Sequence, residues 1–268
     1  TGAALLRQYL PSVVANTPEA VGHVFVADNG STDNSLQVLA DEFPTVTVIP
    51  FPENYGYAEG YNRAIDALSG EYPLVLLLNS DVETPEGWLE PLAAAMDADP
   101  TIGACQPKIL SCADRSRFEY AGACGGYIDR NGYPYCRGRV FERIETDLGQ
   151  YDTPAEVFWA TGAALLTRTA LYKRLGGLDP KFFAHMEEID LCWRILLDGH
   201  KVMAIPASHV YHLGGGSLPA SNPRKTYLNF RNNLLLLHKN LPKADLCATL
   251  LRRRLLDTLA SVSYTHLR

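Results

Sequence analysis

Short apolar runs alternate with helical patterns through the first half of the chain, and this alternation limits the fold more than any other feature of the sequence. The run PLVLLL at 73–78 is apolar except for its first residue, which predicts a strand covered on both faces. Strands and helices that alternate in this way form a mostly parallel sheet flanked by helices, so we predict an α/β fold. The other elements expected in this half are strands at 23–28, 45–49 and 102–109 and helices at 54–68 and 85–98.

The second half of the chain is less regular. An irregular stretch rich in Gly, Tyr and Arg at 110–155 is expected to shape a binding site, since long irregular segments of compact domains are usually functional. The elements expected after it are a buried segment at 159–167, a helix within 182–198, short strands at 201–205 and 208–212, and helices at 225–240 and 244–262.

The composition excludes several classes of protein. Hydrophobic residues make up 47% of the 268 positions and charged residues 20%, which is typical of a globular protein rather than of a disordered or fibrous one. The formal charge of −6, with no basic block longer than Arg252-Arg253-Arg254, argues against a nucleic-acid-binding protein. No apolar run approaches the roughly 20 residues that span a bilayer. The six cysteines follow no zinc-site spacing and are expected to be reduced thiols of a soluble, cytoplasmic protein.

Polar turns follow the expected strands on one side of the sheet. Asp28-Asn29 ends the first strand, and Asn79-Ser80-Asp81 follows the most apolar one. Ligands of open α/β sheets bind outside the carboxyl ends of the strands, so these turns predict a binding site on that rim. Asp28 could accept a hydrogen bond from a nucleobase or a ribose, and Asp81 could hold Mg²⁺ or Mn²⁺ together with phosphate oxygens. The alternative interpretation of both turns is helix capping.

Three carboxylates crowd the start of the helix expected within 182–198: Glu187, Glu188 and Asp190. Like charges in apolar surroundings raise carboxyl pKa values, as a general base near neutral pH requires. The alternative is acidic residues that favour a helix N-terminus while exposed to solvent. His212 ends a short strand before three glycines, and it is either a metal ligand or a structural histidine.

In this order the motifs identify a family. The chain resembles the inverting family 2 glycosyltransferases of the GT-A nucleotide-diphosphosugar fold, and among them the bacterial rhamnosyltransferase-like group. The resemblance runs from about Gly2 to about Leu259. The stretches that carry it are VFVADNGSTDNS, PENYGYAEGYNRAI, LVLLLNSDVETPEGWLEPL, VFWATGAALLTRTAL, GGLDPKFFAHMEEIDLCWRI, IPASHVYHLGGGS and YLNFRNNLLLLHKN.

The resemblance implies roles for particular residues. On the donor side, Asp28 would recognise the nucleobase, and the other nucleotide-sugar-binding positions would be Asn29, Ser31, Asn54, Gly56, Asn62, Asn79 and Asp81. The motif written D-x-D in the family is Asn79-Ser80-Asp81 here, so a single carboxylate would hold the metal, Mg²⁺ or Mn²⁺, with His212 completing the ligand set.

On the acceptor side, the resemblance assigns Trp159, Thr161 and Gly162 to the floor of the site. Glu188 would be the catalytic base and Glu187 its partner, at a pair that most relatives write E-D. The implied reaction moves a sugar from a dTDP- or UDP-sugar, dTDP-rhamnose among them, to a hydroxyl of a glycan or lipid-linked acceptor, with inversion, in cell-envelope polysaccharide synthesis. The alternative function is a non-catalytic nucleotide-sugar-binding subunit, which the loss of one carboxylate at Asn79 would favour. No G-x-G-x-x-G follows the first strand, which excludes a dinucleotide oxidoreductase.

The expected domain organisation is a GT-A domain at 1–240, with its first strand upstream of Thr1, followed by an amphipathic helix and tail at 241–268. That helix would lie on the cytoplasmic face of the inner membrane, with basic residues near anionic lipids. The alternatives are packing on the domain itself or on a second copy in a homo-oligomer. The apolar stripe on which this depends is Leu246, Cys247, Leu250, Leu251, Leu255 and Leu259, flanked by Arg252 and Arg253.

Overall fold

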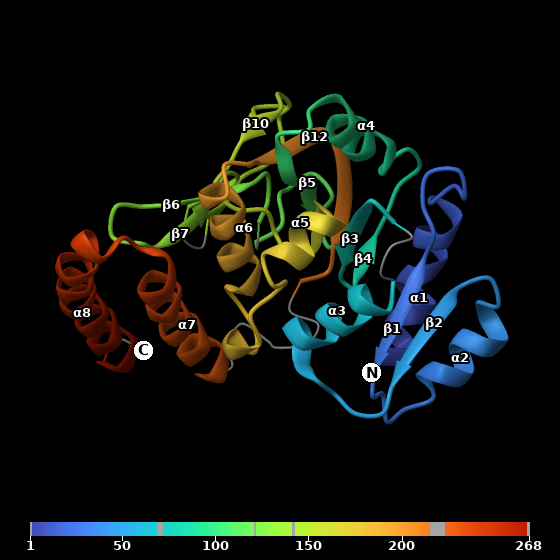
Figure 1. Cartoon of the computed structure of the whole chain (residues 1–268), viewed down its shortest axis with the longest axis horizontal. Helices are drawn as coiled ribbons and strands as arrows, with labels where there is room; N and C mark the ends of the chain where they lie inside the picture. The colour runs from blue at the N-terminus through green and yellow to red at the C-terminus, as the bar shows by residue number, and fades with distance from the viewer. Residues whose placement is uncertain (1, 69–71, 121, 141–142, 215–222, 267–268) are drawn as a thin grey trace.

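A twisted, mixed β-sheet of six strands forms the centre of the molecule (Figure 1). The computed structural model describes residues 2–68, 72–120, 122–140, 143–214 and 223–266, with side chains up to residue 260. The strand order is β10-β12-β5-β11-β3, with β4 beside β12. The strands are β3 (Leu74–Leu78), β4 (Val82–Glu83), β5 (Ile102–Ser111), β10 (Ala155–Glu156), β11 (Ala164–Arg168) and β12 (Lys201–His212).

Three strands of this sheet, β3, β5 and β12, run in the same direction. Strand β11 lies between β3 and β5 and runs antiparallel to both. The sequence predicted two short strands at 201–205 and 208–212, whereas the structure has one strand, β12. Its register against β5 shifts between Ile205 and His209, next to Pro206. Proline has no N–H to donate to the ladder, so the irregularity interrupts the pairing without ending the strand.

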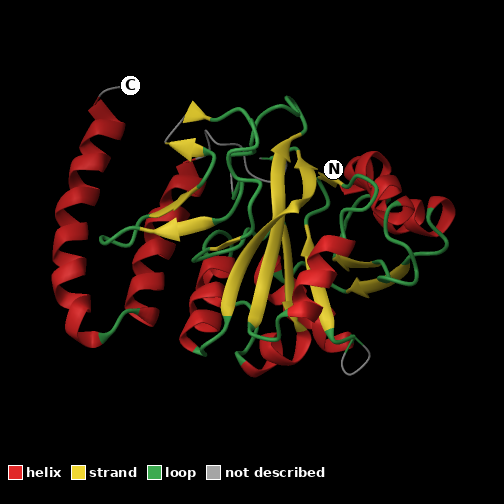
Figure 2. Cartoon of the chain, turned by 90° about the horizontal axis from the view of Figure 1, so that it is seen from above, coloured by secondary structure: helices red, strands yellow, loops and turns green. Residues whose placement is uncertain are grey.

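A separate pair of parallel strands, β1 (Phe25–Asn29) and β2 (Thr47–Phe51), lies beside this sheet with α1 (Gly2–Ala15) and α2 (Ser35–Glu42) (Figure 2). Leu10, Val38 and Leu39 belong to the apolar cluster that joins α1 and α2 to the two strands. Within the described residues β1 pairs with β2 alone. The strand expected upstream of Thr1 lies outside the described residues, so its place stays a prediction.

The apolar core occupies both faces of the central sheet. On one face α4 (Glu90–Ala98) packs Leu92 and Met96 against β5. The other face is covered by α3 (Gly56–Ala67), α5 (Thr169–Arg174) and α6 (Glu187–Leu197). Strand β5 is buried from residue 102 to 110 because it lies between both layers. Strand β3 sends Val75 and Leu77 to one layer and its other residues to the second, where they stay partly exposed.

The irregular region predicted at 110–155 contains two small hairpins, β6 (Gly126–Ile128) with β7 (Pro134–Cys136) and β8 (Arg139–Val140) with β9 (Arg143–Ile144). The buried ammonium group of Lys108 on β5 pairs with Asp147 at 2.7 Å and also with Asp152, which fixes the end of this region to the sheet. A buried cation needs such partners, so the ion pairs have a structural role.

Two antiparallel helices, α7 (Pro223–Asn240) and α8 (Lys243–His266), follow β12 (Figure 1). A short 3₁₀ helix, Pro180–Phe182, precedes α6. Arg253, predicted to flank a membrane-facing stripe, is instead 1% exposed. Its guanidinium lies 3.6 Å from the centroid of the Tyr133 ring and pairs with Asp257 at 3.2 Å. This corrects the prediction for Arg253, because a cation held by a ring and a carboxylate anchors α8 to the β6–β7 hairpin.

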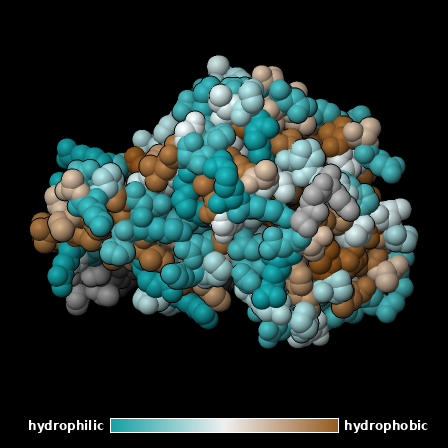
Figure 3. Space-filling model, in the orientation of Figure 1, coloured by the Kyte–Doolittle hydropathy of each residue, from teal (hydrophilic) through white to brown (hydrophobic). Residues whose placement is uncertain are grey.

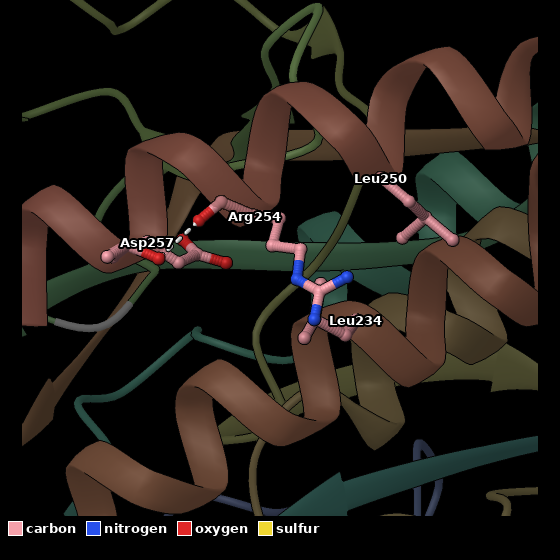
Figure 4. Close-up of a pocket in the computed structure, with 5 residues that line it drawn as sticks. Leu234, Leu250, Arg254 and Asp257 are labelled. Atoms are coloured by element: carbon pink, nitrogen blue, oxygen red, sulfur yellow. Dashed lines mark hydrogen bonds between the residues drawn. The ribbon is translucent and has the colours of Figure 1, made fainter.

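The outer side of α8 remains apolar. Leu251, Leu255 and Leu259 are 60–70% exposed, and the space-filling view shows apolar atoms at this edge of the molecule (Figure 3). Between α7 and α8 lies a cavity of about 430 Å³ bordered by Leu234, Leu250, Arg254 and others (Figure 4). None of the helices in the described part of the chain is long and apolar enough to cross a membrane. All six cysteines are free thiols.

Candidate active site

The carboxyl ends of β1 and β2 form one side of the candidate site. Asn29 joins them, because its side chain donates to the Gly56 carbonyl at 2.8 Å and accepts from the Tyr55 N–H at 2.9 Å. Gly30 has a φ of +68° and lies directly against the backbone of Glu53, where a Cβ would come within 2.4 Å of its carbonyl carbon. Only glycine fits this contact, so the turn after β1 and the loop before α3 are held together.

The predicted donor-binding residues of this rim differ in their surroundings. The Asp28 carboxylate is 5% exposed and accepts a hydrogen bond from the Ser31 N–H at 3.2 Å. Ser31 and Asn54 are exposed, and the Asn54 side chain accepts from the Gly56 N–H at 2.8 Å. Asn29 is held in place by the contacts above, so its role at the rim is to fix the loop geometry.

Asn62 lies deeper than the sequence suggested. Its side chain donates to the Leu178 carbonyl at 2.8 Å and accepts from the Leu178 N–H at 2.9 Å and the Tyr172 hydroxyl at 2.6 Å. With its amide group occupied by these three bonds, Asn62 connects α3 to the segment after α5. We therefore assign it a structural part in the site rather than a direct contact with a donor.

Asp81 and His212, which are 131 residues apart in sequence, meet where β4 pairs with β12. The Nε2 atom of His212 lies 3.1 Å from Asp81 Oδ1, and its Nδ1 atom lies 3.5 Å from Glu119 Oε2. Burial by itself lowers the pKa of His212, but the Asp81 and Glu119 carboxylates outweigh it and raise that pKa to about 9. In the metal-free protein the imidazole is therefore protonated between two carboxylates.

The same cluster fits a divalent cation in part. Among the residues that the structure describes, no three His, Cys, Asp or Glu side chains converge on one point. Asp81 and His212 Nε2 could contribute two ligands, and Glu119 lies on the opposite ring nitrogen, where a carboxylate orients a metal-binding histidine. Mg²⁺ takes few protein ligands and completes its shell with water and phosphate oxygens, which suits such a pair. Asn79, half-buried, is tied to β11 through its N–H, which donates to the Ala163 carbonyl at 3.0 Å.

Glu187 and Glu188 begin α6 and have surroundings unlike those of Asp81. Glu187 is 5% exposed and Glu188 is half-buried, and the Oε2 atom of each is buried without a hydrogen-bond partner among the described residues. Burial raises the pKa of Glu188 to about 7, although nearby backbone N–H groups oppose the shift. Burial and then the Glu188 charge raise the pKa of Glu187 well above its usual range. The pair thus has the properties of a general base near neutral pH.

Asp190, the third carboxylate of this cluster in the sequence, has a different function. It is fully buried and pairs with Arg194 at 2.7 Å and Lys239 at 2.9 Å, and it accepts from the Asn240 side chain at 2.9 Å. These contacts join α6 to α7. Asp190 is therefore a structural ion-pair centre, and only Glu187 and Glu188 remain as candidates for proton transfer.

Gly162 brings the predicted acceptor side next to Glu188. A Cβ on Gly162 would lie 3.7 Å from the Glu188 Cβ and 2.8 Å from the Tyr57 hydroxyl, which donates to the Gly162 carbonyl at 2.8 Å. Ala163, the next residue, accepts from the Asn79 N–H at 3.0 Å. The turn that carries Asp81 and the Glu188 side chain therefore both lie next to the start of β11.

Trp159 and Thr161, which precede Gly162, are both buried. Trp159 is 6% exposed, and its indole N–H donates to the Tyr127 carbonyl at 2.9 Å. Thr161 is 4% exposed, and its backbone N–H donates to the Gln106 side chain at 2.9 Å. Their contacts fix the shape of the predicted acceptor side.

Sequence reasoning missed three residues of the site: Glu119 behind His212, Tyr57 beside Gly162, and Asn232 on α7, whose side chain binds the segment before α6. Tyr57 and Asn232 lie in stretches that carry the family resemblance, but Glu119 lies in the irregular region. Nothing in one sequence indicates that these residues reach a site formed by distant elements.

Comparison with known proteins identifies the family of this chain. The sequence model of Glycosyl transferase family 2 matches residues 2–175. An N-acetylglucosaminyl-diphospho-decaprenol L-rhamnosyltransferase of Mycobacterium tuberculosis is 30% identical over 230 residues, which cover 77% of this chain and 71% of that protein. This chain belongs to glycosyltransferase family 2.

Solved structures confirm the GT-A fold. A mannosyltransferase of Pyrobaculum calidifontis in complex with GDP-Man and Mn²⁺ superposes with a TM-score of 0.60 at 15% identity, covering 98% of this chain and 78% of that one. GalNAc-T7 with UDP, GalNAc and Mn²⁺ superposes with a TM-score of 0.62 at 19% identity, covering 88% of this chain and 45% of that one. This chain thus spans less than half of GalNAc-T7. The α/β fold with C-terminal helices and the family predicted from the sequence are both confirmed.

Proposed function

We propose that this family 2 glycosyltransferase moves one sugar from a dTDP- or UDP-sugar, with dTDP-rhamnose as the first donor to test, to a hydroxyl of a glycan or lipid-linked acceptor with inversion, in cell-envelope polysaccharide synthesis. The observation that carries the proposal is the Glu188 carboxyl group, which has an unpaired oxygen and a pKa raised to about 7 by burial and lies beside Gly162. The similarity to the mycobacterial rhamnosyltransferase supports the choice of donor and acceptor.

In the proposed reaction Glu188 accepts the proton of the acceptor hydroxyl. The hydroxyl oxygen forms a bond to the anomeric carbon while the bond from that carbon to the diphosphate oxygen breaks, and its electron pair leaves with the diphosphate. Attack from the side of Glu188, opposite the leaving group near Asp81, inverts the anomeric centre. Burial and the neighbouring Glu188 charge raise the pKa of Glu187 well above its usual range, which favours its neutral form beside Glu188.

Asp81 and His212 would hold the cation, Mg²⁺ or Mn²⁺. A divalent cation at that position supplies positive charge for the diphosphate leaving group. Glu119 would orient the His212 ring, because its Oε2 atom lies 3.5 Å from His212 Nδ1. The donor nucleotide would lie along the rim formed by Asp28, Asn29, Ser31, Asn54 and Gly56, with Asn79 near the diphosphate.

The experiment is a thermal-shift screen of dTDP- and UDP-sugars with and without Mn²⁺, followed by measurement of nucleoside diphosphate release. A donor at a hundred times its dissociation constant adds about 2.7 kcal/mol of stability, enough for a clear shift. A shift with no turnover on any donor would contradict catalysis and favour the alternative, a nucleotide-sugar-binding subunit, for which Asn79 in place of a carboxylate is the supporting observation.

We also propose that α8 contacts the cytoplasmic face of the inner membrane. Its outer side presents Leu251, Leu255 and Leu259, with Arg252 and Arg254 exposed beside them. Such a face can bury leucines near lipid headgroups while its arginines meet anionic lipids. A lipid-linked acceptor would then lie within reach of the site.

The test is co-sedimentation with vesicles that contain anionic lipid, at low and high salt. The double variant Leu251→Glu/Leu255→Glu should lose binding, while the exposed control Leu197→Glu on α6 should keep it. Equal binding by both variants would remove the membrane role. Dimerisation of the native chain that the double variant abolishes would instead assign this face to a homo-oligomer.

A further inference from the structure

The segment that leads into Glu187 adopts a backbone conformation that side chains disfavour. Phe183, His185 and Met186 have φ angles of +67°, +70° and +78°. Left-handed backbone at non-glycine residues persists only where the surroundings hold it, and it concentrates at functional sites. In the described part of the chain, Ala123 is the other non-glycine residue with a positive φ. The strain therefore lies almost entirely in the four residues before the catalytic pair.

One buried side chain on α7 holds this segment. The Nδ2 atom of Asn232 lies 2.9 Å from the Phe182 carbonyl and 2.7 Å from the carbonyls of both Ala184 and His185. Asn232 is fully buried, and its two N–H donors are shared among these three acceptors. The Phe182 carbonyl also accepts from the Ala184 N–H at 2.8 Å, so the main contribution of Asn232 is to supply hydrogen bonds to the Ala184 and His185 carbonyls.

Arg231 fixes the direction of that amide. Its Nε atom donates to Asn232 Oδ1 at 2.8 Å, so the oxygen is occupied and the NH₂ group faces the carbonyls. Its Nη2 atom also donates to the carbonyls of Lys181 and Phe182 at 2.8 and 2.9 Å. Arg231 and Asn232 together, which we name the α7 clamp, thus bind four consecutive or near-consecutive carbonyls before α6.

The clamped segment touches both halves of the site. Its C-terminal end continues directly into Glu187 and Glu188. Its Phe183 lies next to Gly56 at the start of α3, where a Cβ would be 3.9 Å from the Phe183 carbonyl oxygen. A change of backbone conformation here would rotate the first turn of α6 and move the Glu188 carboxylate relative to the donor rim.

We propose that the α7 clamp positions the catalytic base: Asn232, oriented by Arg231, holds the left-handed segment 183–186 in the one conformation that aims Glu188 at the acceptor hydroxyl. The proposal rests on the proposed transferase function and adds two positioning residues to it. Neither residue meets the substrate. A displacement of about 1 Å at a reacting group can cost about 10²-fold in rate, so loss of the clamp should lower kcat and leave the KM for the donor nearly unchanged.

The matched control is the next residue of the same helix. Asn233 is 2% exposed, and its side chain donates to the Gly132 carbonyl at 2.7 Å and also accepts from Arg253, away from the segment before α6. Asn232→Ala and Asn233→Ala each remove a buried amide and its hydrogen bonds from α7. A merely structural role for Asn232 predicts similar losses of thermal stability and no selective loss of turnover. Arg231→Met, a milder change at a half-buried side chain, covers the case in which Asn232→Ala does not fold.

Two readouts separate this inference from the proposed function. The first is hydrogen–deuterium exchange of peptides that cover residues 183–191, which needs no substrate. Exchange there should increase in Asn232→Ala and, less strongly, in Arg231→Met, but not in Asn233→Ala. Unchanged exchange in both clamp variants would overturn the clamp whatever the activity.

The second readout is release of dTDP from dTDP-rhamnose with Mn²⁺. We expect kcat to fall about 10- to 100-fold in Asn232→Ala, with a smaller fall in Arg231→Met and native kcat in Asn233→Ala. Increased exchange with native kcat in the clamp variants would overturn the positioning role while leaving the proposed function intact. A native protein that turns over no dTDP- or UDP-sugar would remove the proposed function and this inference with it.

Discussion

Two carboxylate clusters lie near the start of β11, and they differ in the charged groups beside them. Asp81 and Glu119 flank the imidazole of His212, whose pKa they raise to about 9 against the effect of burial. Glu187 and Glu188 have no cation beside them among the described residues, and burial raises the pKa of both carboxyls. The first cluster therefore holds a positively charged imidazole between its carboxylates, whereas in the second the Glu188 carboxyl can gain or lose a proton near pH 7.

This difference assigns different chemistry to the same functional group. Carboxylate oxygens are suited to a divalent cation that in turn holds a diphosphate, and a carboxyl that titrates near pH 7 is suited to proton transfer. Asp190, on the same helix as Glu188, is a third case. Its ion pairs with Arg194 and Lys239 give it a structural role. The neighbours of a carboxylate decide its role more than its place in the motif does.

The largest effect should come from removing the proton acceptor. Glu188→Gln keeps the shape of the side chain, so turnover should fall by about 10² to 10⁴ while donor binding remains. Native kcat/KM should also fall below about pH 7, where Glu188 becomes protonated, and the variant should lack this dependence. Steady-state kinetics between about pH 5 and about pH 9, the range around the pKa of Glu188, measure both the loss of turnover and its pH dependence. Glu187→Gln should cost less. Native turnover in Glu188→Gln would refute its assignment as the base.

A smaller loss should follow from the opposite cluster. Asp81→Ala removes the carboxylate beside His212, and the loss of charge stabilisation at the diphosphate should lower turnover by about 10²- to 10³-fold. A chelator should do the same to the native protein, and Mn²⁺ or Mg²⁺ should restore it. The control Asp97→Ala, at an exposed carboxylate on α4, should keep native turnover. Full activity in excess chelator would refute the roles of both Asp81 and His212.

The third prediction concerns stability and not chemistry. Asp190→Ala leaves Arg194 and Lys239 without their shared carboxylate, which should cost about 3 kcal/mol of unfolding free energy. The fraction that folds should keep the native pH dependence of turnover. Denaturant unfolding measures the loss, and Asp198→Ala, at the exposed partner of Arg174, should lose much less. A pH profile in Asp190→Ala that resembles that of Glu188→Gln would show that Asp190 takes part in proton transfer.

The smallest effect should have the opposite sign. Because burial raises the folded-state pKa of Glu188 to about 7 from the usual 4.5, the stability of its neutral form is present below pH 4.5 and is lost as the pH rises through 7. Gln stays neutral, so Glu188→Gln should melt about 2–4 °C above the native protein at pH 8, the shift that about 1 kcal/mol gives in a chain of this size. At pH 4.5 the gain should disappear.

Thermal melts of both proteins at the two pH values measure this effect. The matched control is Glu90→Gln, an exposed glutamate in the first turn of α4, which should show no gain at pH 8. A variant that is no more stable than the native protein at pH 8 would mean that the Glu188 carboxyl is well solvated. That outcome would contradict the raised pKa of Glu188.

Periodicity and residue order determined much of this protein. The apolar run at 73–78 predicted a central strand, and the motif order predicted the family, since strand burial and rim chemistry are encoded locally. Local patterns could not show that 201–212 is one strand, because its continuity depends on pairing with β5. They also predicted that Arg253 flanks a membrane-facing stripe, whereas it is buried against the ring of Tyr133 and the carboxylate of Asp257.

Tertiary structure alone decided the state of each acidic residue. Glu187, Glu188 and Asp190 stand within four positions and look alike in the sequence. Of these three carboxylates, Asp190 is the one that Lys239 and Asn240 of α7 contact. In the same way Glu119 reaches His212 from the irregular region, and Asn232 reaches the segment before α6. The sequence by itself determined which carboxylates exist and near which strand ends they lie. Their charge and function were decided by the fold, because the energy of a charged group depends on burial and on the partners that distant elements bring within a few ångströms.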